Sequence, residues 1–198
     1  EGSGNEIKTS EDGLIITYTD YVGSYQLSLP PNWLALRPNS TEYDEALLLP
    51  EVAVPEISQS LEAIKDLDAD ISRLVLLDTQ AGHYSNGFVN NINIVLDTES
   101  KASLEEIFAK SVLTLPDEIP GAIVTAADIG ETSSELPFGT ISAEWDIETE
   151  SALRVYQNQA VFIVNDNALV ITLTSTADFK EQANELFDIM IDNLVLLD

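Results

Sequence analysis

The chain has 198 residues, and its 35 Asp and Glu against 8 Lys and Arg give a formal net charge of −27 at pH 7. So few cations cannot neutralise a phosphate backbone, and this balance excludes nucleic acid as a partner. The length fits one domain, and with 44% hydrophobic residues the chain can bury enough apolar surface to fold without disulfides or metals. The absence of Cys suits oxidising and reducing compartments equally.

Small and polar residues at the start of the chain predict a flexible leader or tether over residues 1–12. Residues 13–198 contain no second linker and no repeat, so we predict that they form a single domain. No stretch reaches the roughly 18 apolar residues that a membrane span requires. The leader and the acid excess favour a secreted or cell-envelope protein on the outer side of a membrane, and they are compatible with a lipid tether upstream of Glu1.

The first third of the chain predicts strands followed by a helix. Apolar residues at every second position predict strands over 14–18 and 25–29, and a short strand follows over 33–36. Residues 38–54 have no clear period and contain two prolines, so we expect a long surface excursion there. Apolar residues near helical spacing then predict a helix over 55–71, with Pro55 suited to its first position.

The middle third predicts two strands and a second helix. Short apolar runs predict strands over 73–78 and 88–96. Ser103 and Glu106 have the spacing of a capping box, in which a hydroxyl and a carboxylate each bind a free backbone N–H at a helix start. A helix is therefore expected over 103–115, ending at Pro116.

The last third predicts a meander and a closing helix that begins near Ala177. The meander strands are expected over 122–129, 139–147, 153–164 and 168–174. An antiparallel order of strands with interspersed helices indicates the α+β class. We predict an αβα sandwich, with a central, mostly antiparallel sheet and helices on both faces.

Short motifs in the chain resemble a known family. The pattern Tyr-x-Leu-x-Leu-Pro-x-x-Trp over 25–33 resembles the opening strand and turn of the PsbP-like family, which includes the Mog-type Ran-binding proteins. The strand over 87–94 and the Ser-Leu-Glu-Glu start over 103–106 are similar to its mid-domain strand and helix. The resemblance implies an αβα sandwich and no enzyme.

Two characterised branches of this family are accessory subunits of photosystem II and GTPase-binding proteins, and many bacterial relatives are uncharacterised lipoproteins. The chain matches no binding motif of either branch, so the resemblance assigns no functional residue. It favours the lipoprotein branch of the cell envelope.

The sequence predicts no catalytic residue, cofactor or metal. His83 is the sole histidine, and no nucleophile or carboxylate that could orient it is recognisable from the sequence. We therefore interpret His83 as an exposed loop residue whose removal changes stability by less than about 0.5 kcal/mol. With one His and no Cys, we expect no structural or catalytic zinc site. Asp66, Asp68 and Asp70 alternate as in a calcium loop, but Ile71 stands where an EF-hand needs Gly.

A row of carboxylates is the candidate interaction surface. These residues recur at every second position and are Glu144, Asp146, Glu148 and Glu150. On a strand they would share one face while Trp145 and Ile147 point to the core. The row could attract a basic protein surface or loosely held cations, or it could be an ordinary solvent-facing side of an acidic protein.

Three asparagines interrupt an otherwise apolar strand, at Asn90, Asn91 and Asn93. They could line a ligand pocket, reach neighbouring loops or face solvent at the end of a sheet.

We therefore predict a non-catalytic, extracytoplasmic binding or protein-interaction module whose partner is a basic protein surface. One alternative is a small-ligand or cation-binding domain of the same fold. The other is an acid/base enzyme that uses a close pair of its many carboxylates, which would need one pKa strongly raised. The oligomeric state and the identity of the ligand stay open.

Overall fold

The fold comes from a computed structural model, which describes residues 4–85, 87–147 and 152–197. The strands are β1 (Asn5–Thr9), β2 (Ile16–Asp20), β3 (Tyr25–Leu29), β4 (Leu34–Leu36), β5 (Ser72–Leu77), β6 (Tyr84–Ser85), β7 (Phe88–Val89), β8 (Asn91–Asp97), β9 (Ile123–Glu131), β10 (Pro137–Ile147), β11 (Leu153–Val164), β12 (Asn167–Thr176) and β13 (Val195–Leu196). The helices are α1 (Thr41–Ala46), α2 (Pro55–Lys65), α3 (Leu104–Glu118) and α4 (Lys180–Asp192), with 3₁₀ turns η1 (Pro50–Ala53) and η2 (Ala177–Phe179).

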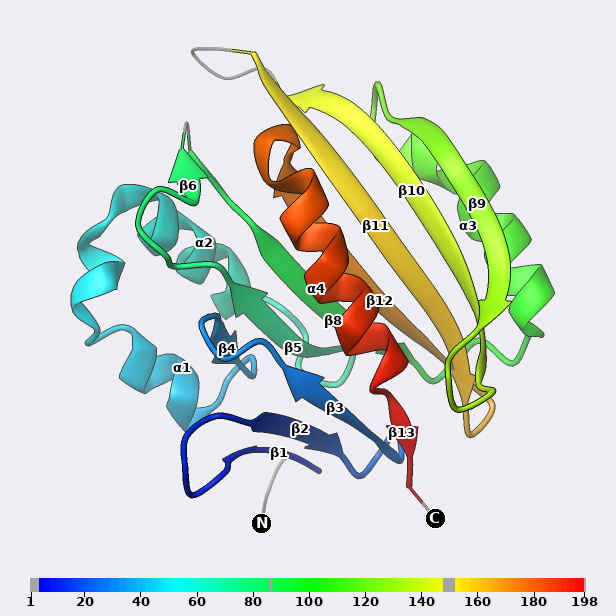
Figure 1. The fold of residues 1–198 in the computed structure, drawn as a ribbon, viewed down its shortest axis with the longest axis horizontal. Coiled ribbons are helices and arrows are strands. Elements are labelled where there is room, and N and C mark those ends of the chain that lie inside the picture. Colours follow the sequence, from blue (N-terminus) through cyan, green and yellow to red (C-terminus); the bar gives the residue numbers. More distant parts are fainter. Residues whose placement is uncertain (1–3, 86, 148–151, 198) are drawn as a thin grey trace.

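A large antiparallel sheet forms the centre of the molecule (Figure 1). Within the described residues it has seven strands in the order β4-β5-β8-β12-β11-β10-β9. Its long strands β10, β11 and β12 follow each other in the chain and pair antiparallel in that order, which makes them a meander. At the β11–β12 turn, Asn165 and Asp166 have φ of 48° and 61°, a conformation that these two residue types tolerate.

A smaller sheet has the order β1-β2-β3-β13 among the described residues. Its first strand corrects the expectation of a flexible leader, because Asn5–Thr9 pair along their whole length with β2. Asn5 is buried, and its Nδ2 donates to the Tyr18 hydroxyl at 3.0 Å. The composition of the first residues indicated a spacer. Pairing with β2, which follows in the chain, instead orders β1 as a strand.

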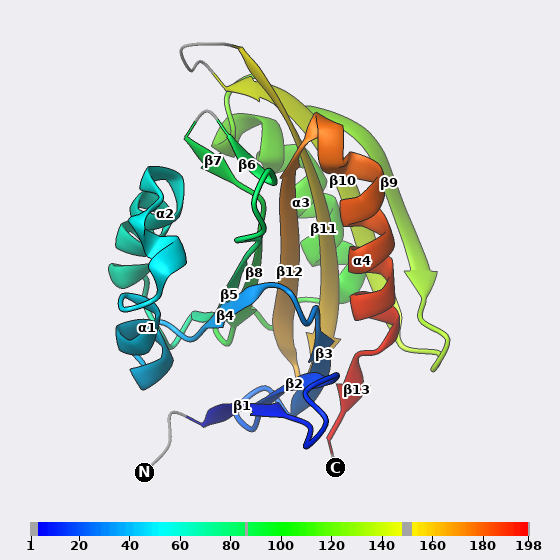
Figure 2. The ribbon, with the colours of Figure 1, turned by 60° about the vertical axis from the view of Figure 1, so that its left-hand side comes forward.

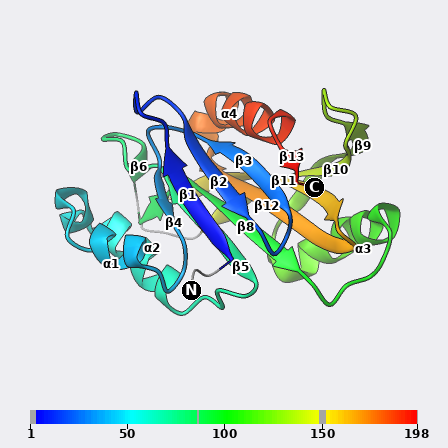
Figure 3. The same ribbon diagram turned by 90° about the horizontal axis from the view of Figure 1, so that it is seen from below.

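Helices cover both faces of the large sheet (Figure 3). Side chains of one strand alternate between these faces, so Leu74 and Leu76 of β5 join the core beneath α4 while Val75 and Leu77 join the core beneath α2. On the side of α2, the helix α3 packs on Ile141 and Ala143 of β10. The predicted αβα arrangement is confirmed, and the small sheet lies beside α4 on the same face.

The helices differ from their predicted bounds in ways that local contacts explain. Ser103 and Glu106 form the predicted capping box of α3, which continues past Pro116 to Glu118. Helix α2 ends at Lys65 instead of 71, because the Asp68 carbonyl accepts the N–H groups of Ile71 and Ser72 in a turn. The expected excursion over 38–54 contains α1 and η1, which are too short to show a helical period.

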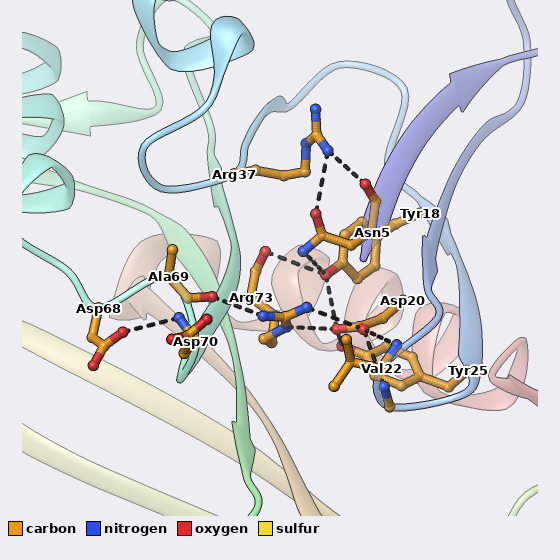
Figure 4. A network of polar contacts seen from close by, with 11 residues as sticks. Asn5, Tyr18, Asp20, Val22, Tyr25, Arg37, Asp68, Ala69, Asp70 and Arg73 are labelled. Carbon is orange, nitrogen blue, oxygen red and sulfur yellow. Dashed lines mark hydrogen bonds and ion pairs between the residues drawn. The ribbon is translucent and has the colours of Figure 1, made fainter. Parts of the chain in front are cut away.

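A buried polar network joins the two sheets (Figure 4). Arg73 of β5 donates from Nε to Asp20 Oδ2 at 2.7 Å and from Nη2 to Asp20 Oδ1 at 3.2 Å. Asp20 and Arg73 are 0% and 4% exposed, and the hydroxyls of Tyr18 and Tyr25 also donate to the Asp20 carboxylate. Burial opposes the charge on Arg73, but the hydrogen bonds and charge of Asp20 outweigh it and raise the pKa of Arg73.

For Tyr18 and Tyr25, burial raises the pKa of the hydroxyl, so both stay protonated and remain donors to Asp20. The Asp20 carboxylate completes its shell with the backbone N–H groups of Val22 and Gly23, at 3.0 and 3.1 Å. The network thus satisfies a buried charge pair with hydrogen bonds from both sheets, and it fixes the small sheet against the edge region of the large one.

Candidate functional site

A groove of about 510 Å³ is lined by residues of α2, of the turn after it and of strands β5 and β8. Figure 2 shows α2 lying beside the sheet that contains these strands. Helix α2 begins at Pro55 and buries Ile57, Leu61 and Ile64, whose spacing of three and four residues forms one apolar face. That face packs on Val75 and Leu77 of β5. Packing at these positions leaves a space beside the helix, over β5 and β8.

The walls of the groove are mostly apolar. Helix α2 contributes Ala63 and Ile64, and the turn that follows it contributes Leu67 and Ile71. Ile71 is 51% exposed, which leaves much of an aliphatic side chain open to the groove and solvent. A surface of this kind gains free energy when a ligand removes it from water.

The floor of the groove holds uncharged polar side chains. Asn91 and Asn93 of β8 line it, and Asn93 Nδ2 donates to Asn91 Oδ1 at 3.1 Å. Strand register places Asn93 beside Thr172 of β12 and Thr172 beside Gln159 of β11, with Gln159 Nε2 donating to Thr172 Oγ1 at 3.3 Å. A parallel row on the same sheet face consists of Asn91, Thr174 and Gln157.

The electrostatic character of the groove differs from that of the chain as a whole. Of the described residues that line it, Asp68 is the one with a charged side chain. The floor offers amide and hydroxyl groups, each able to donate and accept hydrogen bonds. The groove is thus a neutral, amphipathic site on a strongly acidic protein.

The three asparagines of the predicted strand have two different roles. Asn91 and Asn93 line the groove, as one of the alternatives for them anticipated. Asn90 is 1% exposed and points elsewhere, accepting from the Thr176 N–H at 3.0 Å and donating to the His83 carbonyl at 3.2 Å. Asn90 lies between β7 and β8, and its side chain ties the end of β12 to the loop at 80–83.

His83 has a carboxylate partner that the sequence did not reveal. Its Nδ1 lies 2.8 Å from Oδ2 of the buried Asp78, and its ring lies 4.5 Å from the ring of Phe179. A turn in which the His83 N–H binds the Gln80 carbonyl, with Gly82 at a φ of 91°, brings the two residues together. The interpretation of His83 as an unpartnered loop residue was wrong, because the backbone turn is invisible in the residue pattern.

We expect the substitution His83→Ala to lower the free energy of unfolding by about 1–3 kcal/mol, because it leaves the buried Asp78 carboxylate short of a donor. The substitution His83→Gln retains an N–H donor and should lose less. Urea denaturation followed by circular dichroism measures both, and a loss below about 0.5 kcal/mol for His83→Ala would restore the earlier interpretation.

The carboxylate row is partly neutralised by cations. Glu144 Oε1 lies 2.5 Å from Lys180 Nζ, and Arg154 contacts both Glu144 and Asp146 at 3.3 and 3.1 Å. The hydrogen bond from Lys180 is the largest cause that lowers the pKa of Glu144. Lys180 also lies 4.4 Å from the centre of the Tyr156 ring. Glu148 and Glu150 lie outside the described residues.

The other acidic pattern forms part of a turn. Asp68 Oδ1 accepts the Asp70 N–H at 2.9 Å, as an Asp side chain commonly does in a turn. Among the described residues, no three His, Asp or Glu side chains are grouped so that they could hold a metal ion.

In the described part of the chain, every helix is too short or too polar to span a bilayer.

No family model and no curated protein sequence matches the chain. Several solved structures are similar to the chain. LpqN of Mycobacterium tuberculosis, a protein involved in cell envelope biogenesis, is 10% identical with a TM-score of 0.53 over 98% of this chain and 91% of LpqN. A mutant of Mog1 is 13% identical with a TM-score of 0.50 over 98% and 96%. The cyanobacterial PsbP protein of Synechocystis sp. PCC 6803 is 10% identical with a TM-score of 0.49 over 99% and 94%.

The chain therefore has the α+β fold of LpqN and Mog1, over nearly the full length of each. What it shares with them is the arrangement of helices and strands.

Proposed function

We propose that this protein is a non-catalytic binding module of the PsbP-like and Mog-type group, and that it holds an uncharged, partly apolar small molecule in the groove between α2 and β8. The observation behind the proposal is the groove itself, with aliphatic walls and a floor of amides and hydroxyls. Its volume of about 510 Å³ falls within the range of about 300–1,000 Å³ that is usual for small-molecule sites.

The chemistry of the lining selects against anionic ligands. The described lining contains no Lys or Arg, so an anion would find no counter-charge while meeting Asp68 and the field of a chain with net charge −27. A cation would find one carboxylate. An uncharged ligand with an apolar side and hydrogen-bonding groups on its other side matches both walls and floor.

The lining also favours binding over catalysis. General acid/base work needs a titratable pair within hydrogen-bonding reach of the substrate. The groove instead presents Asn91 and Asn93 with Ser60 and aliphatic side chains, which orient a ligand without moving protons.

We further propose that the module works outside the cytoplasm. The fold shared with LpqN, a protein involved in cell envelope biogenesis, and the large acid excess support this location. Fractionation of the source cells should place the protein with envelope or secreted markers, and its recovery with cytoplasmic markers would contradict the location but not the groove.

A pair of matched dyes tests the groove. N-phenyl-1-naphthylamine is uncharged and has one N–H group, and 8-anilinonaphthalene-1-sulfonate has the same ring system with an added sulfonate. We expect the neutral dye to bind with enhanced fluorescence, and the anionic dye to bind at least about tenfold more weakly, a difference of about 1.4 kcal/mol.

The substitution Ala63→Phe places an aromatic ring in the groove from an exposed helix position. It should weaken binding of the neutral dye at least about tenfold. The matched control Ala109→Phe puts the same ring on an exposed position of α3, away from the groove, and should leave binding unchanged. Equal binding of both dyes, or binding that Ala63→Phe does not weaken, would refute the proposed ligand class.

A further inference from the structure

The last strand of the large sheet has an open edge. Strand β9 is nine residues long and pairs with β10, and within the described residues no strand lies on its other side. Backbone N–H and C=O groups along such an edge are available to another extended chain. Eight of the nine residues are exposed, and Ile123 and Ile129 are 61% and 49% exposed.

A second groove, of about 420 Å³, lies between the end of β9, β10 and α4. Its apolar part comes from Phe138 of β10 and from Phe187 and Ile189 of α4. The polar part includes three carboxylates, those of Glu131, Asp188 and Asp192. Another carboxylate lies close by, because Asp128 of β9 is paired in register with Thr140, which lines the groove.

These carboxylates differ from the row on β10 in one respect. Lys180 and Arg154 neutralise Glu144 and Asp146, whereas no Lys or Arg of the described ranges lies within ion-pair distance of Glu131, Asp188 or Asp192. Asp192 accepts the Ser133 N–H at 2.6 Å instead. Desolvation raises the pKa of the Asp188 carboxyl, whose residue is nevertheless exposed and open to a cation. A cation beside it would stabilise the charged carboxylate.

We propose that β9 accepts an extended, Lys- or Arg-bearing segment of a partner protein as an additional strand, with the cations of that segment placed over Glu131, Asp188 and Asp192. The backbone edge provides the pairing, and the groove between β9 and α4 provides places for alternate side chains. This site is separate from the groove beside α2. The basic partner that the sequence predicted is thereby assigned to the edge of β9 and no longer to the carboxylate row on β10.

Charge argues for a basic partner over a second copy of this chain. Pairing of β9 with itself would supply no cation, because the strand contains Asp128 and Glu131 and no Lys or Arg, and like charges on neighbouring strands destabilise a sheet. Each copy also has a net charge of −27, which opposes association at moderate ionic strength.

The test uses a peptide of alternating Lys and Thr, about ten residues long, to match the length of a β-strand. The control peptide replaces two central Thr with Pro, which keeps every charge but removes the backbone N–H donors that strand pairing needs. At low ionic strength the first peptide should bind and slow hydrogen exchange of amides in 123–131. The Pro peptide should bind at least about fivefold more weakly and give no protection there.

Variants of the protein then locate the binding charges. The double substitution Glu131→Gln and Asp188→Asn should weaken binding of the Lys-Thr peptide about five- to tenfold. The matched control Glu62→Gln with Asp66→Asn removes the same charge from exposed positions at α2, on the opposite face, and should have a much smaller effect.

Three results would overturn the proposal. The first is equal binding of the Lys-Thr and Pro peptides. The second is a loss of binding confined to the variant Glu144→Gln with Asp146→Asn, which would assign the surface to the carboxylate row on β10. The third is dimerisation of the free protein with protection of 123–131, which would assign the edge to a second copy.

Discussion

The substitution Asp20→Asn should lower the free energy of unfolding by about 3–5 kcal/mol, because it removes the charge that balances a buried guanidinium. Arg73 is 4% exposed and donates twice to this carboxylate, so without the negative charge it stays desolvated and unpaired. The amide that replaces the carboxylate can still accept the N–H groups of Val22 and Gly23, so the turn keeps its hydrogen bonds. The measured loss then reports the removal of the charge and not a change in the turn. Urea denaturation measures the loss.

Two controls define the origin of this effect. The double substitution Asp20→Asn with Arg73→Met removes both charges and should be less destabilising than Asp20→Asn alone, because no unpaired charge is then buried. The substitution Lys8→Met breaks an ion pair with Glu6 at a side chain that is 70% exposed, and should cost much less than Asp20→Asn, because solvent screens exposed pairs. A loss below about 1 kcal/mol for Asp20→Asn would show that water reaches Arg73.

The substitution Phe187→Ala should also destabilise the fold by about 3–5 kcal/mol, because it opens a cavity between α4 and the large sheet. Phe187 is 1% exposed and lies in the core shared by α4, the large sheet and the small sheet. Its loss removes the largest buried side chain of α4, so near-ultraviolet circular dichroism should change together with stability.

The matched control is Ile189→Ala, two residues further along the same helix. Ile189 is 62% exposed, so its truncation should change the free energy of unfolding by about 0.5 kcal/mol or less. Similar losses for the two variants would mean that α4 does not hold its buried face against the sheet.

The residue pattern was sufficient to predict the strands in which apolar and polar side chains alternate over many residues. In β8, Ile92, Ile94 and Leu96 face the core while Asn91 and Asn93 face the groove, so both the strand and its polar side were visible in the sequence. The capping box at Ser103 also predicted the start of α3 correctly, because its hydrogen bonds join residues three apart.

Elements that depend on distant partners could not be predicted. Strand β1 lacks an apolar pattern and is ordered by pairing with β2 and by the contact of Asn5 with Tyr18. Strand β13 has two residues and exists because β3 lies next to it. A local pattern has no information about either pairing, since the free energy comes from residues elsewhere in the chain.

The candidate sites, too, could be predicted only where a local pattern of residues marks them. Asn91 and Asn93 indicated a polar floor, but its apolar wall needs α2 to pack on β5 and Ile71 to fold back over β8. The carboxylate row was visible as a pattern, whereas its neutralisation by Lys180 required α4 to lie across β10 and β11. The edge of β9 follows from the strand order, which no single segment of the sequence specifies.

The small sheet has a consequence for the order in which the molecule can assemble during synthesis. Val195 and Leu196 pair with Gln26 and Tyr25, so about 170 residues separate the partners, and closing so long a loop is entropically costly. A chain emerging from the ribosome can form β1 to β3 early, yet the strand that pairs with β3 is synthesised only about 170 residues later. Until then the edge of β3 is unprotected, and this sheet cannot be completed however early its first three strands have formed.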